Sequence, residues 1–224
     1  MIWVNGKKIE QDHFSAGELK IKLFGCGKER MDIVWHYEND AELFTIMCIR
    51  DYYASHKAIL YIPYLPHARM DRVKADSDVF TLKYFCEIIN SLNFKIVWVR
   101  DAHSNVSLAL LDRVEDTGVE PYIHKATLAS NAEVLFFPDE GAMKRYSGMI
   151  SAPYAFGIKE RDWATGKIKG LSVFDGGQSI EGKTVLIVDD ISSRGGTFYH
   201  SAKKLKELGA AKVFLYVTHC ENTI

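Results

Sequence analysis

The sequence comprises 224 residues, of which 47% are hydrophobic and 25% are charged, and its formal net charge is −1. This length can bury a sizeable core in one large α/β unit or two small ones, and the composition is that of a soluble globular protein. A net charge so close to zero gives no reason to expect nucleic acid or an acidic membrane as a partner.

The sequence shows no targeting or membrane signal. Its first ten residues lack signal-peptide architecture, and no apolar run approaches membrane-spanning length. The four cysteines lie far apart, and Cys48 and Cys86 fall within apolar helical patterns that favour buried thiols. We therefore expect a protein of the reducing cytoplasm.

Short apolar runs alternate with helical patterns along the chain. The runs are rich in Val, Ile, Phe and Tyr, and several are apolar at consecutive positions, as strands covered on both faces are. They predict strands at residues 31–37, 58–63, 95–100, 133–138, 184–188 and 212–217. The alternation of strands and helices favours mainly parallel sheets with right-handed crossovers.

Three helices are predicted between these strands. The first begins at Asn39, and Glu42 lies at the spacing of a capping box. The second begins near Ser77, and the third follows Gly196 and ends at Gly209. Helical spacing of apolar residues predicts their buried faces: Leu82, Phe85, Cys86 and Ile89 in the second helix, and Phe198, Ala202, Leu205 and Leu208 in the third.

The order of elements suggests two similar halves, residues 1–124 and 125–224. Each half contains a strand that runs into a loop with an aspartate, VWVRDAHSN in the first and VLIVDDISS in the second. Residues 152–174 do not fit the alternation, because a polar middle separates two apolar flanks. This stretch is predicted to be a β-hairpin flap, of the kind that closes over phosphate chemistry and excludes water.

The strongest functional signal is the segment VLIVDDISSRGGT at residues 185–197. Four apolar residues carry Asp189 and Asp190 to the carboxyl end of a parallel strand, where open α/β sheets bind ligands. The loop through Gly195 and Gly196 opens a helix, so backbone N–H groups and the helix N-terminus favour a phosphate. The carboxylates suit ribose hydroxyls or hydrated Mg²⁺. The compact order of acids and glycines disfavours the alternative of a plain turn with solvated acids.

This segment resembles the phosphoribosyl-pyrophosphate loop shared by type I phosphoribosyltransferases and ribose-phosphate pyrophosphokinases. Four further segments resemble the pyrophosphokinases: FSAGEL at residues 14–19, YIPYLPHARMDR at 61–72, RDAHS at 100–104 and FPDEGAMKR at 137–145. The resemblance implies an α/β fold of two phosphoribosyltransferase-like halves, with mainly parallel sheets flanked by helices. It also implies an enzyme, a transferase of the ribose-phosphate diphosphokinase type.

Two of these segments imply an ATP site. By the resemblance, Arg69, Asp71 and Arg72 line the nucleotide site, and guanidinium groups suit triphosphate oxygens. Phe14 and Glu18 are implied to reach the adenine ring of ATP bound by a neighbouring subunit. The expected partners are therefore ATP, a ribose-5-phosphate-like acceptor and further copies of the chain, in a homodimer or a higher homo-oligomer.

The other segments imply metal and transfer sites. Asp101 and His103 are implied to approach Mg²⁺–ATP, and Asp139 to contact ribose or the metal, so Mg²⁺ is the expected cofactor. Lys159 and Arg161 on the flap are implied to stabilise charge that develops on phosphorus, and with His103 they form the expected catalytic set. The expected acceptor site contains Asp139, Asp189, Asp190, Ser192, Ser193, Arg194, Gly195, Gly196 and Thr197.

The implied reaction is attack of the anomeric hydroxyl of ribose 5-phosphate on the β-phosphorus of Mg²⁺–ATP, which yields phosphoribosyl pyrophosphate and AMP. The sequence departs from the family pattern at three places. Family members commonly have an acid at the position of Ser193 with Thr at that of Arg194, and Asn or Asp at that of Ala16. They also usually continue with another α/β stretch beyond the position of Cys220.

Three alternatives stay open. A larger 5-substituted ribose such as ADP-ribose would offer Arg194 an additional phosphate. A nucleobase phosphoribosyltransferase explains the DDISSRGGT loop but leaves FSAGEL, HARMDR and RDAH without roles. A catalytically silent regulatory homologue is compatible with the altered loop, whereas the intact KER at residues 159–161 argues against it.

Overall fold

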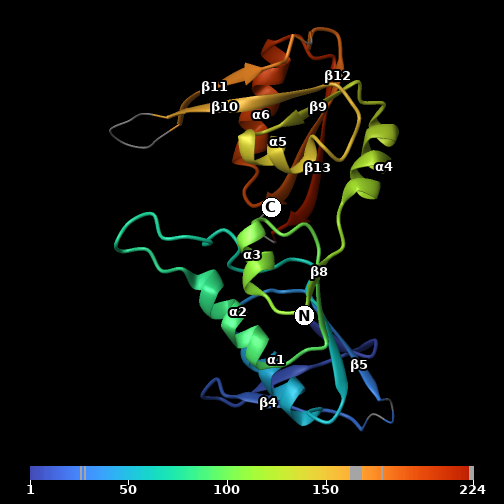
Figure 1. The fold of residues 1–224 in the computed structure, drawn as a ribbon, viewed down its shortest axis with the longest axis vertical. Helices are drawn as coiled ribbons and strands as arrows, with labels where there is room; N and C mark the ends of the chain where they lie inside the picture. The colour runs from blue at the N-terminus through green and yellow to red at the C-terminus, as the bar shows by residue number, and fades with distance from the viewer. Residues whose placement is uncertain (26, 28, 162–167, 178, 222–224) are drawn as a thin grey trace. The chain divides into compact units, whose positions relative to one another are not determined.

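The computed structural model describes residues 1–25, 27, 29–161, 168–177 and 179–221, with side chains described up to residue 158 and again from residue 172 around the flap. The chain divides into two compact units, Met1–Gly118 and Val119–Ile224 (Figure 1). The boundary expected at residues 124/125 would fall inside helix α4 (Glu120–Ser130). The second unit instead begins at Val119, the residue directly before this helix.

The N-terminal unit is built on a six-stranded sheet of order β2-β1-β5-β6-β7-β8, in which β5 to β8 run parallel. β1 and β2 are antiparallel additions at one edge, and β3 and β4 form a separate hairpin. The elements are β1 (Ile2–Val4), β2 (Lys7–Lys8), β3 (Gln11–His13), β4 (Leu19–Ile21), β5 (Arg30–Trp35), α1 (Ala41–Tyr52), β6 (Lys57–Tyr61), α2 (Thr81–Ser91), β7 (Ile96–Val99), α3 (Asn105–Leu110) and β8 (Val114–Asp116).

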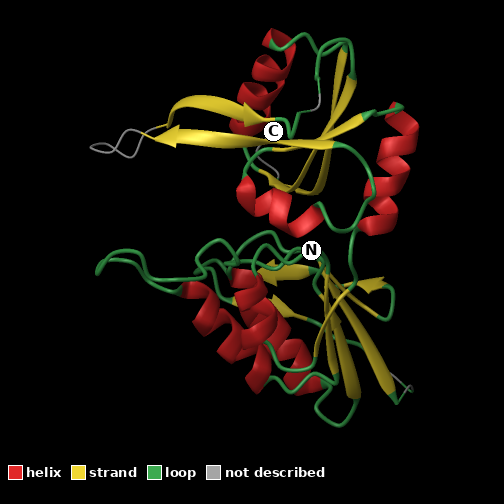
Figure 2. Cartoon of the chain, turned by 45° about the horizontal axis from the view of Figure 1, so that its top comes forward, coloured by secondary structure: helices red, strands yellow, loops and turns green. Residues whose placement is uncertain are grey.

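All three helices of this unit lie on one face of its sheet. From β5 to β8, each connection leads to the next strand of the sheet in the same direction. Because such connections are right-handed, their helices all lie on the same side of the sheet (Figure 2). Met31, Ile33 and Trp35 of β5 point to that side and join one buried cluster with Ile49 of α1 and Phe85 of α2. Within the described part of this unit, no helix lies on the other face.

The C-terminal unit has a five-stranded sheet of order β11-β10-β9-β12-β13, parallel except for β11. The chain leaves β9 toward one edge and β12 toward the other, so α5 and α6 cover opposite faces, with a buried cluster under each. The elements are α4, β9 (Val134–Phe137), α5 (Glu140–Tyr146), β10 (Tyr154–Arg161), β11 (Ile168–Phe174), β12 (Thr184–Ser192), α6 (Gly196–Glu207) and β13 (Lys212–Cys220).

The structure confirms the predicted α/β class and the elements that carry strong apolar patterns. All six predicted strands are present, as β5, β6, β7, β9, β12 and β13, and the three predicted helices are α1, α2 and α6. The flap is an antiparallel hairpin of β10 and β11. No helix in the described residues is long and apolar enough to cross a membrane.

Some details of the predicted helices were wrong. Glu42 does not close a capping box: it is 2% exposed, and its carboxylate accepts hydrogen bonds from Glu38 N–H and Trp35 Nε1–H. α2 begins at Thr81 and not near Ser77, because the carboxylate of Asp78 accepts from two backbone N–H groups and holds a turn there.

Two further burial predictions failed. In α6, Leu208 is 39% exposed because it follows the last helical residue, and Ser201 is buried in its place. In α1, Cys48 is only half-buried, whereas Cys86 of α2 is buried as predicted.

Candidate functional site

Two adjacent acids lie near the carboxyl end of β12 in the C-terminal unit. Asp189 and Asp190 follow four buried residues of β12, and Asp190 is 4% exposed. The neighbouring strand β9 ends just before Asp139. Because the chain leaves β9 and β12 in opposite directions, the three acids lie at the reversal point where open α/β sheets bind ligands.

Asp190 is paired with an arginine from α5. Arg145 Nη1 lies 2.6 Å from Asp190 Oδ2, and the two side chains are 23% and 5% exposed. The guanidinium also lies over the Tyr146 ring, with 5.5 Å from Cζ to the ring centroid. Asp190 Oδ1 accepts from Ile191 N–H at 2.9 Å. These contacts hold the Asp190 carboxyl group in a defined position.

Asp189 is in the opposite electrostatic situation. Burial, together with the negative charges of Asp190 and Asp139, raises its pKa to about 8. Its Oδ1 accepts a hydrogen bond from Asp190 N–H at 3.0 Å, which opposes the shift without cancelling it. A cation or hydroxyl donor that a ligand brings close to this carboxyl group would stabilise its ionised form.

The loop after these acids leads into the N-terminus of α6, where Gly195 is the N-cap. Gly195 has φ +71°, a left-handed conformation that disfavours other residues, and it is the N-cap of α6 without a side-chain hydrogen bond to the first turn. A Cβ at Gly195 or Gly196 would meet no atom within 4 Å. The space beside these two glycines is therefore open, as the close approach of a phosphate to the helix N-terminus requires.

The remaining predicted residues of this loop differ in exposure. Ser192 is buried, Ser193 is half-buried, and Arg194 and Thr197 are exposed. Asp139 is the N-cap of α5, where its Oδ1 accepts from Ala142 N–H at 3.1 Å. The structure thus brings Asp139, Asp189 and the glycine loop to one end of the C-terminal sheet.

In the N-terminal unit, Asp71 joins two predicted loops. The loops follow β6 and β7, which are parallel neighbours. Asp71 is 7% exposed and binds Arg72 through two hydrogen bonds, Nε–Oδ1 at 2.6 Å and Nη2–Oδ2 at 2.8 Å. Ser104 Oγ donates to Oδ2 at 2.6 Å. The Arg72 pairing, aided by Ser104 and by the charge of nearby His103, lowers the pKa of Asp71 to about 2.

Asp101 has an unusual backbone conformation that another acid supports. Its φ is +52°, in the left-handed region, and the residue is 6% exposed. The carboxylate of Asp116, at the end of β8, accepts from Asp101 N–H at 2.9 Å and from Ala102 N–H at 3.2 Å. A left-handed conformation of a non-glycine residue costs free energy and persists only when surrounding contacts hold it. The two hydrogen bonds to Asp116 are such contacts.

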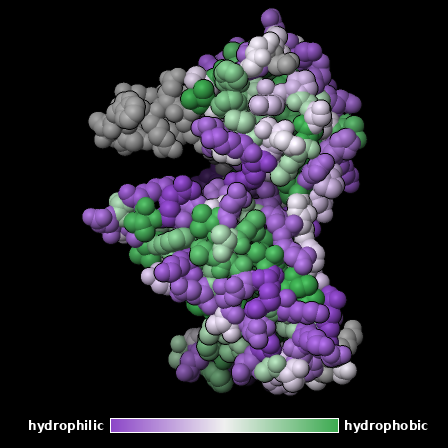
Figure 3. All heavy atoms as spheres, in the orientation of Figure 1, coloured by the Kyte–Doolittle hydropathy of each residue, from purple (hydrophilic) through white to green (hydrophobic). Residues whose placement is uncertain are grey.

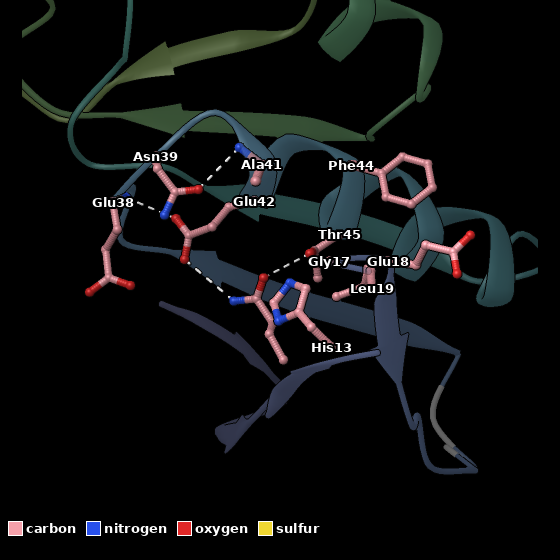
Figure 4. A pocket seen from close by; sticks show the side chains of 11 residues that line it. His13, Gly17, Glu18, Leu19, Glu38, Asn39, Ala41, Glu42, Phe44 and Thr45 are labelled. Carbon is pink, nitrogen blue, oxygen red and sulfur yellow. Dashed lines mark hydrogen bonds between the residues drawn. The ribbon is translucent and has the colours of Figure 1, made fainter. Parts of the chain in front are cut away.

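The predicted adenine segment forms the tip of the β3–β4 hairpin. Phe14 is 55% exposed and lies near Lys20, whose Nζ is 5.6 Å from the ring centroid. Glu18 lines a pocket of about 620 Å³ between the hairpin and the start of α1, with Gln11, His13, Thr45 and Phe44 (Figure 4). The Asp71 loop does not line this pocket, so the two predicted parts of the ATP site are separate features of the unit.

The flap residues are placed only by their backbone. Lys159 and Arg161 lie in β10, where they pair with Leu171 and Ile168 of β11. Their side chains lie outside the described residues, as does the connection at residues 162–167. Arg69 is exposed in the loop that carries Asp71.

No protein-family model matches the sequence. A ribose-phosphate pyrophosphokinase of Saccharolobus solfataricus is 31% identical over 225 residues, which cover 95% of this chain and 76% of that protein. One from Pyrococcus abyssi is 29% identical over 226 residues, covering 94% and 75%. The chain belongs to the ribose-phosphate pyrophosphokinase family. Membership in this family makes it a transferase.

A solved structure shares the fold. The phosphoribosylpyrophosphate synthetase of Mycobacterium smegmatis superposes with a TM-score of 0.75 at 18% identity, covering 95% of this chain and 72% of that one. The predicted fold class is therefore confirmed.

The acids of this pyrophosphokinase homologue fit a hard divalent cation. Among the described residues, no group of three or more His, Cys, Asp or Glu side chains is arranged to hold a metal. Mg²⁺ usually takes one or two protein carboxylates and completes its shell with water and substrate phosphates. Asp189 beside Asp190 and Asp139 supplies such oxygens, and their mutual repulsion would be relieved by a cation. The predicted metal residues Asp101 and His103 belong to one unit and Asp139 to the other.

Sequence reasoning missed the residues that position the predicted ones. Arg145 was given no role of its own, and Ser104 and Asp116 were not singled out. Ser104 carried a local signal, since it precedes α3 and its Oγ accepts from Val106 N–H as an N-cap. Asp116 carried none, because its partners depend on β7 and β8 being adjacent.

Replacing Asp189 with Asn should stabilise the protein at high pH. The folded-state pKa of about 8 lies above the ordinary 3.8, so the folded state retains a proton that the unfolded chain releases. Stability is therefore lost as pH rises from about 4 to 8. Asn keeps the acceptor for Asp190 N–H and removes the charge. We expect a gain on the order of 2 kcal/mol at pH 9 that shrinks toward pH 5.

Thermal unfolding in EDTA between pH 5 and pH 9 measures this effect. Asp112→Asn, at an exposed position, is the control and should show no pH-dependent gain. An equal change in melting temperature for Asp189→Asn at both ends of the range would contradict the assignment.

Replacing Ser104 with Ala should destabilise the N-terminal unit by about 1–3 kcal/mol. The buried carboxylate of Asp71 loses a donor, and α3 loses its N-cap. Urea denaturation followed by circular dichroism measures the change. Ser104→Thr, which keeps the hydroxyl, should recover most of it, and Ser91→Ala, at an exposed serine, should stay within about 0.5 kcal/mol of the parent. Equal stability of Ser104→Ala and Ser91→Ala would refute the role.

Proposed function

We propose that the chain is a Mg²⁺-dependent diphosphotransferase that moves the β,γ-diphosphoryl group of ATP to the anomeric hydroxyl of ribose 5-phosphate, yielding phosphoribosyl pyrophosphate and AMP. The observation that carries this is the end of β12, where Asp189 and Asp190 lead into the left-handed Gly195 and the uncapped first turn of α6. Family membership supports the same reaction.

The acceptor is held by groups of the C-terminal unit. The N–H groups from Gly195 to Thr197 bind the 5-phosphate, since a helix N-terminus carries partial positive charge. Asp190, fixed by Arg145, and Asp189 accept hydrogen bonds from the ribose hydroxyls. A protonated Asp189 at neutral pH can also donate one. Asp139, Ser192 and Ser193 complete the acceptor site.

ATP is bound by groups of the N-terminal unit. Arg72, held by Asp71, and Arg69 bind phosphate oxygens. Phe14 stacks on the adenine of ATP in a neighbouring subunit, with Glu18 as its polar partner. Asp101, His103 and Asp139 are the residues that would hold Mg²⁺, which neutralises phosphate charge when bound. Lys159 and Arg161 stabilise the transferred group, and His103 positions the nucleotide. The chemistry requires these groups to meet in the working assembly.

Product analysis tests the proposal directly. Purified protein is mixed with Mg²⁺, ATP and ribose 5-phosphate, and the products are identified by mass spectrometry. We expect AMP and phosphoribosyl pyrophosphate in equal amounts, in a reaction that stops when EDTA is added. ATP binding without turnover on any acceptor would instead identify a silent homologue. Consumption of phosphoribosyl pyrophosphate with a nucleobase would identify a phosphoribosyltransferase.

Replacing Lys159 with Ala should lower turnover roughly 10²- to 10³-fold, because it removes a cation that acts on the transition state. The KM values should change little, and the thermal unfolding curve should stay near that of the parent. Lys125→Ala, at an exposed position on α4, is the matched control and should leave turnover unchanged. Near-normal turnover of the Lys159 variant would exclude the flap lysine from the chemistry.

A second acceptor deserves a test because of Arg194. This residue is exposed directly before Gly195, and within the described residues it has no hydrogen bond or ion pair. An acceptor with a diphosphate at the 5-position, such as ADP-ribose, would place its outer phosphate beyond the one held by the α6 N-terminus. A free guanidinium there suits that phosphate.

Arg194→Thr separates the two acceptors. If the natural acceptor is a 5-diphosphate, the variant should lose roughly tenfold or more in kcat/KM for ADP-ribose while keeping its value for ribose 5-phosphate. Lys203→Thr, elsewhere on α6, is the control for loss of one positive charge. A parent enzyme that prefers ribose 5-phosphate and a variant with the same acceptor ratio would exclude the larger substrate.

A further inference from the structure

The loop that follows β7 is held at both of its ends. At its start, Asp101 has φ +52°, and its N–H donates to Asp116 Oδ1 at 2.9 Å. The N–H of the next residue donates to Asp116 Oδ2 at 3.2 Å. At its end, Ser104 donates to the buried Asp71 at 2.6 Å and caps α3. Asp101 and His103, the two residues of this unit proposed to hold Mg²⁺, lie between these anchors.

The carboxylate of Asp116 accepts a third backbone hydrogen bond, from the connection between the two units. Gly118 N–H donates to Oδ1 at 3.1 Å, and Gly118 is the last residue of the N-terminal unit. Between these two residues, Thr117 N–H donates to Val99 O at 2.9 Å, and Thr117 Oγ1 accepts from Arg100 Nε at 3.1 Å. The segments that end β7 and β8 are therefore joined residue by residue, which fixes the position of the Asp116 carboxylate.

The contacts from Asp116 maintain a backbone conformation that Asp101 would otherwise leave. Positive φ is uncommon for residues other than glycine, and a residue in this region stays there only when its surroundings hold it. A carboxylate is a stronger acceptor for backbone N–H groups than a neutral oxygen. Without these hydrogen bonds, Asp101 would relax toward a helical or extended conformation, and the direction of its side chain would change.

We propose that Asp116 is a positioning residue for the metal nucleotide. It holds Asp101 in the left-handed conformation in which that residue takes part in binding Mg²⁺–ATP, so the loop is ordered before ATP arrives. The inference rests on the proposed function, since it takes Asp101 as one of the residues that would hold Mg²⁺. In this role Asp116 acts only through Asp101.

The surroundings of Asp116 allow matched variants. The residue is exposed, so its replacement should leave the core of the unit intact. Asn keeps one acceptor oxygen and Ala keeps none, so Ala should have the larger effect. Glu115→Gln, one residue earlier in β8, and Glu87→Gln on α2 each remove one exposed carboxylate and are the controls. Glu87 belongs to the helix side of the unit, where hydrophobic residues gather on the surface over α2 and α3 (Figure 3).

Calorimetric titration of the full chain with ATP, in the absence of an acceptor, measures the effect. The dissociation constant is determined in EDTA and in Mg²⁺, and the ratio of the two values is the gain in affinity that the metal brings. Asp116→Ala should lower this ratio about fivefold, because the loop must then be ordered when the metal nucleotide binds. Its affinity for ATP in EDTA should change less than about twofold. Asp116→Asn should lie between Asp116→Ala and the parent, and both controls should match the parent.

A double-variant cycle distinguishes positioning from general support of the fold. Asp101→Asn removes the carboxylate and keeps a residue type that tolerates positive φ. If Asp116 acts through Asp101, Asp116→Ala should not lower the ratio further in the Asp101→Asn background. Its effect on the melting temperature should be similar in both backgrounds, because the hydrogen bonds to the backbone are lost in each.

Three results would overturn the proposal alone and leave the proposed reaction standing. In the first, Asp101→Asn lowers the ratio and Asp116→Ala leaves it unchanged. In the second, Asp116→Ala weakens ATP binding equally in EDTA and in Mg²⁺. In the third, the double variant loses more of the ratio than Asp101→Asn does. A ratio that Asp101→Asn leaves unchanged would instead remove Asp101 from the metal site, and would overturn that part of the proposed function together with this inference.

Discussion

The burial of two neighbouring carboxyl groups near the carboxyl end of β12 organises the C-terminal site. Four buried residues carry Asp189 and Asp190 to a point where water is scarce, and Asp139 arrives there from β9. Arg145 pairs with Asp190. Burial, reinforced by the charges of Asp190 and Asp139, raises the pKa of Asp189 to about 8, so ligands that bring cations or hydroxyl donors stabilise the site. The glycine loop beside it attracts the opposite charge, that of a phosphate.

The two units reach ligand sites by different topologies. In the C-terminal unit the chain leaves β9 and β12 in opposite directions, so the acids lie at a reversal point of the sheet. In the N-terminal unit every crossover runs the same way, and no such point exists among β5 to β8. Its polar groups instead come from the long loop after β6 and the short loop after β7, which the hydrogen bond between Asp71 and Ser104 connects. A second carboxylate, that of Asp116, holds the loop after β7 by accepting from Asp101 N–H and Ala102 N–H.

The sequence could predict elements whose information is local. Consecutive apolar residues identified six strands, and the spacing of Leu82, Phe85, Cys86 and Ile89 identified the buried face of α2. The segment at residues 185–197 also carries its meaning locally, since acids, glycines and helix start follow one another. The short strands β1 to β4 were missed because two or three residues hold no periodicity. The partners of Asp190 and Asp101 were missed because strand order, which sequence pattern does not reveal, decides which loops meet.

The direction of the crossovers also explains why the N-terminal sheet has helices on one face only. These crossovers put α1, α2 and α3 on one side, and the described helices of the unit leave the other face of its sheet without a helical layer. Tyr61 and Trp98 are adjacent on neighbouring parallel strands, and the residues next to them in sequence, Leu60 and Val97, are buried beneath the helices. Each strand is thus apolar on both faces, as a central layer would be.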